Sequence, residues 1–143
     1  MSGKSDFFEA QRFALIGGGK GRSFPKLTRR YLEQAGKEVH VVDLSADGGS
    51  GSLAELLDGI PSDTEAVIVE VPKEQTAGVV QGILDQGFDN LWIHQMTDTE
   101  EAVEVCRARG VNPHTGSCAV MYLAPGLSPH ALHRAVWKLI GRY

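Results

Sequence analysis

The chain has 143 residues, of which 42% are hydrophobic and 22% charged, and its formal net charge is −4. This size and composition suit one globular domain that needs no disulfide or metal to fold. The acidic balance argues against general nucleic-acid binding, which requires a basic face. No apolar run approaches the roughly 20 residues of a membrane span, and no secretory signal opens the chain. We therefore expect a single cytoplasmic domain over residues 1–143.

Short apolar runs rich in β-branched residues alternate with stretches of helical periodicity. In chain order they predict strand 13–16, helix 25–34, strand 39–42, helix 53–57, strand 66–71, helix 74–85, strand 91–93, a helix that a capping box at 97–100 opens and that ends at 109, strand 111–115 and helix 129–140. Pro113 interrupts the last strand, because proline cannot donate a ladder hydrogen bond, and this places the strand at a sheet edge.

Strands that alternate with helices predict a parallel sheet with right-handed crossovers. We expect an α/β fold with a doubly wound, five-stranded parallel sheet in the strand order 3-2-1-4-5. Local signals refine the helices: Ser23 is the expected N-cap of the first, and Thr97 opens the fourth in a capping box with Glu100. The apolar face of the first helix is expected to carry Leu27, Tyr31, Leu32 and Ala35. Cys106 is expected in the core.

A glycine-rich turn joins the first strand directly to the first helix, with the sequence Gly17-Gly18-Gly19-Lys20-Gly21-Arg22-Ser23-Phe24-Pro25. Glycine permits positive φ and lets a phosphate approach the backbone. The start of the helix offers free N–H groups and the positive end of its dipole. Lys20, Arg22 and Lys26 add positive charge at the same place. The alternative is a tight turn with solvated basic residues, but in doubly wound folds this crevice is the usual ligand site.

The turn matches neither common nucleotide fingerprint. The dinucleotide pattern GxGxxG requires glycine where Arg22 stands, and in the phosphate-loop pattern GxxxxGK[ST] the lysine is followed by Ser or Thr, whereas Lys20 is followed by Gly21. The motif alone therefore supports neither NAD nor ATP.

Taken together, several segments make the chain resemble the stand-alone CoA-binding domain family, which is related to the nucleotide-binding domain of the succinyl-CoA synthetase α subunit. The resemblance covers nearly the whole chain and depends on the order and spacing of its pieces. These are Phe13-Ala14-Leu15-Ile16-Gly17 with the loop after it, Leu32-Glu33-Gln34-Ala35-Gly36-Lys37-Glu38-Val39, Val67-Ile68-Val69-Glu70-Val71-Pro72, Leu91-Trp92-Ile93-His94-Gln95, Ala108-Arg109-Gly110-Val111 and Gly116-Ser117-Cys118.

The resemblance implies a Rossmann-like domain that binds the ADP part of coenzyme A. The loop from Gly17 to Phe24 would hold the phosphates, and Val71 and Pro72 would flank the adenine. Further site residues implied by position are His94 and Gln95 after the fourth strand, and Ser117 and Cys118 in the loop after the last strand.

Asp43 keeps an alternative open. Family members place Asn-Pro after the second strand, whereas this chain has Asp43-Leu44. In NAD enzymes an acidic residue at this position holds the ribose 2′-hydroxyl, and its charge would repel a ribose phosphate. Asp43 is therefore a candidate site residue for NAD as well as an ordinary residue at a strand end.

No catalytic or metal-binding set of residues stands out, because the histidines are scattered and lack a metal signature. The sequence predicts a non-catalytic carrier or regulatory module for coenzyme A or an acyl-CoA. The alternatives are an NAD(H)-binding oxidoreductase or redox-sensing domain that uses Asp43, and an interaction module with a vestigial pocket. We expect a small-molecule nucleotide ligand, no nucleic-acid or membrane partner, and a homodimer as the assembly common among small domains.

Overall fold

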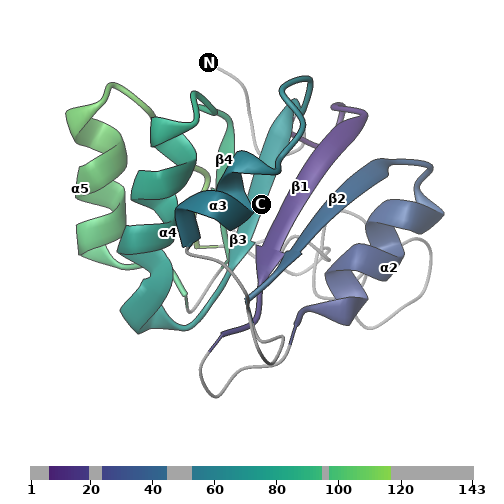
Figure 1. The fold of residues 1–143 in the computed structure, drawn as a ribbon, viewed down its shortest axis with the longest axis horizontal. Coiled ribbons are helices and arrows are strands. Elements are labelled where there is room, and N and C mark those ends of the chain that lie inside the picture. Colours follow the sequence, from purple (N-terminus) through teal and green to yellow (C-terminus); the bar gives the residue numbers. More distant parts are fainter. Residues whose placement is uncertain (1–6, 20–23, 45–52, 95–96, 117–143) are drawn as a thin grey trace, which may run out of the picture.

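The computed structural model describes residues 7–19, 24–44, 53–94 and 97–116. These residues form a four-stranded parallel sheet in the order β2-β1-β3-β4, with helices on both faces (Figure 1). The strands are β1 (Arg12–Gly17), β2 (Glu38–Asp43), β3 (Ala66–Glu70) and β4 (Leu91–Ile93). The helices are α2 (Lys26–Gln34), α3 (Leu53–Asp58), α4 (Lys73–Asp85) and α5 (Glu100–Ala108). The predicted α/β class and parallel sheet are confirmed, and the predicted helix 129–140 lies outside the described residues.

The predicted fifth strand at 111–115 is wrong as an element. In this segment His114 forms an isolated parallel bridge with Trp92. The His114 amide donates to the Leu91 carbonyl over 2.9 Å, and the Ile93 amide donates to the His114 carbonyl over 2.8 Å. The bridge extends the sheet beside β4 by one residue, next to the proline that cannot donate.

The predicted strand order 3-2-1-4-5 is also wrong, because β3 lies beside β1 and not beyond β2. The burial of the strands gives the physical reason. All residues of β3 are buried, whereas β2 is mostly half-exposed and begins with the exposed Glu38. A strand that is apolar on both faces gains most free energy at the centre of the sheet, and one that carries Glu38 and His40 is better placed at an edge.

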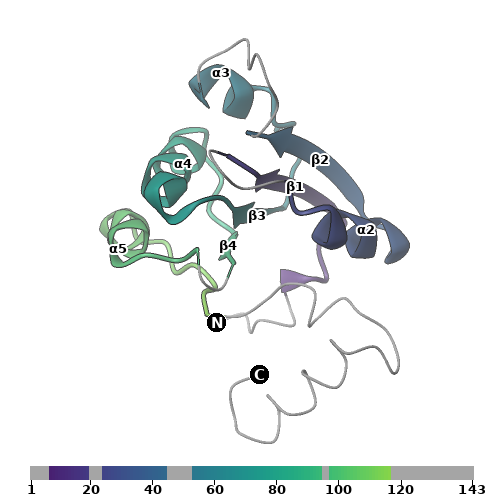
Figure 2. The same ribbon diagram turned by 90° about the horizontal axis from the view of Figure 1, so that it is seen from below.

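The sheet separates two cores. Helices α3, α4 and α5 lie on one side of it and α2 lies on the other (Figure 2). Ala14 and Ile16 of β1 point into the core under α3, α4 and α5, while Phe13 and Leu15 point into the core on the α2 side. Cys106 of α5 belongs to the first core, as predicted, and burial raises the pKa of its thiol.

Aromatic side chains cover much of the α2 side of the sheet. Phe7 has its ring centroid 5.7 Å from that of Phe13 and 5.3 Å from that of Trp92. His114 lies 5.5 Å from Phe7 in an edge-on arrangement. Aromatic pairs at these separations add favourable energy beyond the burial of their area. Phe7, which precedes β1, therefore belongs to the core on this side of the sheet.

Two predicted helix caps differ from the structure. The N-cap position of α2 is Pro25, and the predicted cap Ser23 lies outside the described residues. The N-cap of α5 is Thr99, whose hydroxyl accepts from the Ala102 amide over 3.0 Å. The hydroxyl of Thr97 donates instead to the His94 carbonyl over 2.7 Å.

The buried face of α2 also differs from the prediction. It consists of Thr28 and Leu32, while Leu27 is 42% exposed and Ala35 is exposed. A polar residue therefore occupies a position for which periodicity favours an apolar one.

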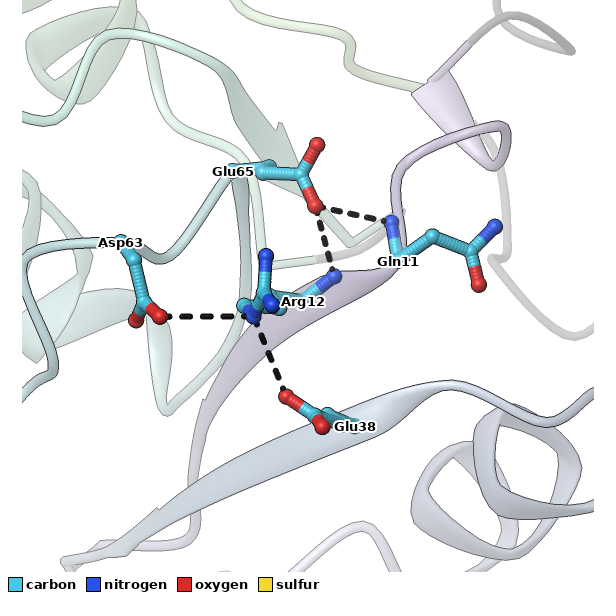
Figure 3. Close-up of polar contacts among 5 residues, drawn as sticks. All are labelled: Gln11, Arg12, Glu38, Asp63 and Glu65. Atoms are coloured by element: carbon cyan, nitrogen blue, oxygen red, sulfur yellow. Dashed lines mark hydrogen bonds and ion pairs between the residues drawn. The ribbon is translucent and has the colours of Figure 1, made fainter.

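Charged residues mark the amino-terminal edge of the sheet (Figure 3). The Nε atom of Arg12 lies 3.2 Å from a carboxylate oxygen of Glu38 and 3.3 Å from one of Asp63. One carboxylate oxygen of Glu65 accepts from the amides of Gln11 and Arg12 over 3.1 and 3.0 Å. These side chains are largely exposed, so the ion pairs contribute little to stability. In the described part of the chain, no helix has the length and apolar character needed to cross a bilayer.

Two glycines within α4 provide a matched test of helix packing. A Cβ at Gly78 would meet open space, whereas one at Gly82 would overlap Cδ1 of the buried Leu57 in α3. Gly78→Ala should therefore raise the free energy of unfolding by roughly 0.5–1 kcal/mol, the usual gain for alanine over glycine within a helix. Gly82→Ala should lose this gain to overpacking. Urea denaturation of both variants measures the difference, and equal gains would contradict the α3–α4 contact.

Candidate functional site

The carboxyl ends of β2, β1 and β3 meet in one row. In the sheet register Gly17 lies opposite Asp43 on one side and opposite Glu70 on the other. The Gly17 carbonyl accepts from the Leu44 amide over 2.9 Å, and the Gly18 amide donates to the Glu70 carbonyl over 3.3 Å. The end of β1 therefore lies between two acidic residues, Asp43 and Glu70.

Successive strands are added to opposite sides of β1, so the order of strand addition changes direction between β1 and β3. From β1 it crosses to β2, and from β2 it returns past β1 to β3. Helices α2 and α4 leave the adjacent strands β1 and β3 on opposite faces (Figure 2). The point where strand order reverses is where open α/β sheets bind ligands. The predicted strand order would have placed β4 beside β1. In the structure β3 lies there, and its last residue, Glu70, is opposite Gly17.

At each described glycine of the turn, steric or backbone constraints disfavour any other residue. A Cβ at Gly17 would overlap the ring of Pro25, which leads into α2. Gly18 has φ 74° and Gly19 has φ 147°, backbone conformations that other residues rarely adopt. A Cβ at Gly19 would also overlap the Gln75 side chain and lie 2.7 Å from Cδ of Pro72. The turn is therefore pressed against the beginnings of both helices.

Helices α2 and α4 begin without a side-chain cap. Their N-cap positions are Pro25 and Pro72, which make no side-chain hydrogen bond to the first turn. By contrast, the first turn of α5 is capped by Thr99. The first-turn amides of Lys26 and Gln75 donate to the carbonyls of Phe24 and Pro72. For the other first-turn amides, an anion is a partner that the helix dipole favours.

A buried carboxylate lies at the centre of the row. Glu70 is 3% exposed, and its Oε1 accepts a hydrogen bond from the Thr28 hydroxyl over 2.8 Å. The Nδ1 atom of His94 lies 3.0 Å from the same oxygen. This separation allows an ion pair when the ring is protonated, but the atoms are not aligned for a hydrogen bond, and Nδ1 is buried without one. Most buried polar atoms in proteins have a hydrogen-bond partner, so this nitrogen is an exception.

The structure brings together several of the predicted site residues. Gly17, Gly18 and Gly19 form the buried end of β1 and its turn, Asp43 lies beside them, and His94 follows β4 one strand further away. The predicted site residues outside the described part of the chain are Lys20, Gly21, Arg22, Ser23, Gln95, Ser117 and Cys118.

The other four predicted site residues that the structure describes differ in how far their side chains are buried. Phe24 and Val71 are buried in the two cores, so neither side chain presents a surface to a ligand. Pro72 is half-buried at the beginning of α4, and Lys26 is exposed in the first turn of α2. Of the pair expected to flank adenine, Pro72 is thus the one with accessible surface.

Sequence reasoning missed Thr28, Glu70 and Gln75. Glu70 had a visible signal, because it is a charged residue within the otherwise apolar run from Val67 to Val71. Such a residue is rarely buried without a partner. Its partner Thr28 lies 42 positions earlier, and no local pattern connects the two.

Hollows on the described part of the chain lie away from this row, and two of them are lined by carboxylates in a way that bears on the ligand. One of about 530 Å³ lies beside the first turn of α5, and three of its lining residues are the carboxylates Asp98, Glu100 and Glu104. Another of about 240 Å³ lies at the amino-terminal edge, between Glu38 and Asp63. Arg107 lines the first and Arg12 the second, but in each the carboxylates outnumber the arginine, which disfavours a polyanion. Among the described residues, no group of three or more His, Cys, Asp and Glu side chains could hold a metal ion.

The CoA binding domain family matches residues 11–124, which is most of the chain. The chain therefore belongs to the CoA-binding domain family, as the resemblance implied. No curated protein matches it.

Two solved structures share the fold. A conserved hypothetical protein from Pyrococcus furiosus has a TM-score of 0.59 at 20% identity, over 76% of this chain and 96% of that one. Prb, described as the PH1109 protein redesigned for binding, has a TM-score of 0.64 at 19% identity, over 90% of this chain and 97% of that one. At such identities the similarity shows the fold alone.

Gly19 and Gly36 provide a matched test of the turn. Both have positive φ, but a Cβ at Gly36 meets nothing within 4 Å, whereas one at Gly19 overlaps the beginning of α4. Gly36→Ala should cost about 1 kcal/mol of unfolding free energy from backbone strain alone. Gly19→Ala should cost about 1–3 kcal/mol more from overpacking. Chemical denaturation measures both, and equal costs would mean that the turn does not press on α4.

Proposed function

We propose that the chain binds coenzyme A, or an acyl-CoA, through its ADP moiety in the crevice at the carboxyl ends of β1 and β3, and that it acts as a non-catalytic carrier or regulatory module. Family membership supports coenzyme A as the ligand class. The observation that carries the location is the convergence on one glycine turn of two helix beginnings without side-chain caps, those of α2 and α4.

The chemistry of a pyrophosphate suits this place. First-turn amides and the positive ends of two helix dipoles favour an anion. The Gly18 amide is engaged by the Glu70 carbonyl, so the hydrogen bonds to phosphate must come from other groups of the turn. Lys20, Arg22 and Lys26 are the cations that the sequence places there, and charge-assisted hydrogen bonds to phosphate are strong.

Asp43 supports the alternative of an NAD(H)-binding redox enzyme or sensor. It lies directly across the sheet from Gly17, at the end of β2. A carboxylate there can accept hydrogen bonds from ribose hydroxyls, which suits NAD, and repels a phosphate carried on the ribose. The two ligands are therefore separable by direct comparison.

Thermal unfolding with a panel of coenzyme A, acetyl-CoA, NAD, NADP and ATP should show stabilisation by coenzyme A or acetyl-CoA. A ligand at a hundred times its Kd adds about 2.7 kcal/mol, which shifts the melting temperature by several degrees for a domain of this size. A shift with NAD alone would favour the redox alternative. No shift with any of the five would favour an interaction module with a vestigial pocket.

The double substitution Lys20→Ala/Arg22→Ala should weaken coenzyme A binding and flatten its dependence on salt, because two charge-assisted phosphate contacts are lost. A matched control is Lys37→Ala/Arg107→Ala, which removes the same charge from exposed or half-exposed positions outside the crevice. Calorimetry at two salt concentrations measures both effects. Unchanged affinity in the first double variant, or equal losses in both, would remove the turn from the site.

A further inference from the structure

The Glu70 carboxylate lies in an environment that opposes its charge. It is 3% exposed at the end of β3, a strand whose other residues are apolar. Burying a carboxylate costs free energy unless hydrogen bonds or opposite charges compensate for the lost water. Glutamate at this position is therefore a costly choice for the core, and its contacts indicate what it holds in place.

Glu70 contacts both ends of the connection between β1 and α2. Its backbone carbonyl accepts from the amide of Gly18, where the connection begins, over 3.3 Å. Its side chain accepts from the hydroxyl of Thr28, in the first turn of α2, over 2.8 Å. Thr28 is itself only 2% exposed. One residue of the neighbouring strand thus contacts the chain at Gly18, where the proposed phosphate-binding turn begins, and at Thr28, in the first turn of the helix that follows it.

The same carboxylate also lies close to the residue that follows β4. His94 follows β4, and its Nδ1 lies 3.0 Å from the oxygen to which Thr28 donates. The His94 backbone amide donates to the Val69 carbonyl, one residue before Glu70, over 3.0 Å. Glu70 therefore connects α2, β3 and the residue after β4 around a single oxygen atom.

We propose that Glu70 is a positioning residue of the nucleotide site, which holds the beginning of α2 at the crevice by accepting the hydrogen bond of Thr28. This rests on the proposed function of coenzyme A binding. A helix start held in place before the ligand arrives avoids the entropy cost of ordering it on binding. An apolar contact of the same volume would fill the space without fixing a direction, because a hydrogen bond depends on angle and van der Waals packing does not.

The experiment measures coenzyme A affinity by calorimetry and the unfolding midpoint by urea denaturation for the same set of variants. Thr28→Val and Glu70→Leu each remove the hydrogen bond while keeping a similar volume, and should weaken binding about tenfold or more. Thr28→Ser and Glu70→Gln keep a donor and an acceptor, and should stay within about threefold of the parent chain.

The double variant Thr28→Val/Glu70→Leu separates positioning from stability. Because it pairs two apolar side chains, it should recover the unfolding midpoint that each single variant loses. Its affinity for coenzyme A should nevertheless stay about tenfold low. A purely structural role predicts that affinity and midpoint recover together, and that result would overturn the proposal.

Glu65→Leu is the matched control. Glu65 likewise accepts hydrogen bonds through one carboxylate oxygen, in its case from the amides of Gln11 and Arg12, but at the amino-terminal ends of the strands (Figure 3). It should leave coenzyme A affinity unchanged, and a loss equal to that of Glu70→Leu would overturn the proposal. Parent-like affinity in Thr28→Val would do so too, while leaving the proposed function intact. If the parent chain fails to bind coenzyme A, the proposed function itself fails, and the positioning role fails with it.

Discussion

The parallel register between β1 and β3 is the constraint on which the rest of the structure depends. It aligns Phe13 with Ala66 at one end and Gly17 with Glu70 at the other. A slip of one residue would turn Phe13 and Leu15 toward the wrong core, because successive side chains point to opposite faces. It would also part the Gly18 amide from the Glu70 carbonyl. Core packing and the alignment of the carboxyl ends of β1 and β3 are therefore set by the same hydrogen-bonded ladder.

Carboxylates differ in their surroundings between the amino-terminal and the carboxyl-terminal ends of the strands. At the amino-terminal edge, Arg12 lies between the exposed carboxylates of Glu38 and Asp63, where water screens the charges and little stability is at stake. At the carboxyl-terminal ends, Glu70 is buried, and one of its two carboxylate oxygens accepts from Thr28 of α2 and lies 3.0 Å from Nδ1 of His94, the residue after β4. A buried arrangement of this kind restricts geometry far more than an exposed ion pair does, which suits an edge at which a ligand is expected.

Family membership and similarity of fold support different conclusions about this chain. Membership of the CoA-binding domain family supports a ligand class, and the solved structures near 20% identity support the fold alone. Discrimination between coenzyme A and NAD depends on individual groups around the crevice. Asp43 beside Gly17 favours ribose hydroxyls, while the two helix beginnings at Pro25 and Pro72 favour phosphates. Both features fit an ADP moiety, and the substituent on its ribose distinguishes the two ligands.

Local patterns were enough to place the strands and helices of the described chain within a few residues, because periodicity, prolines and glycines act over one or two turns. They also located the glycine turn. The order of the strands depended on which faces become buried, so the exposed Glu38, the half-exposed His40 and the fully buried β3 could be interpreted only in the assembled sheet. The contact between Thr28 and Glu70 is of the same kind. Each residue is an ordinary polar exception in its own segment, and their hydrogen bond exists because the fold brings α2 and β3 together.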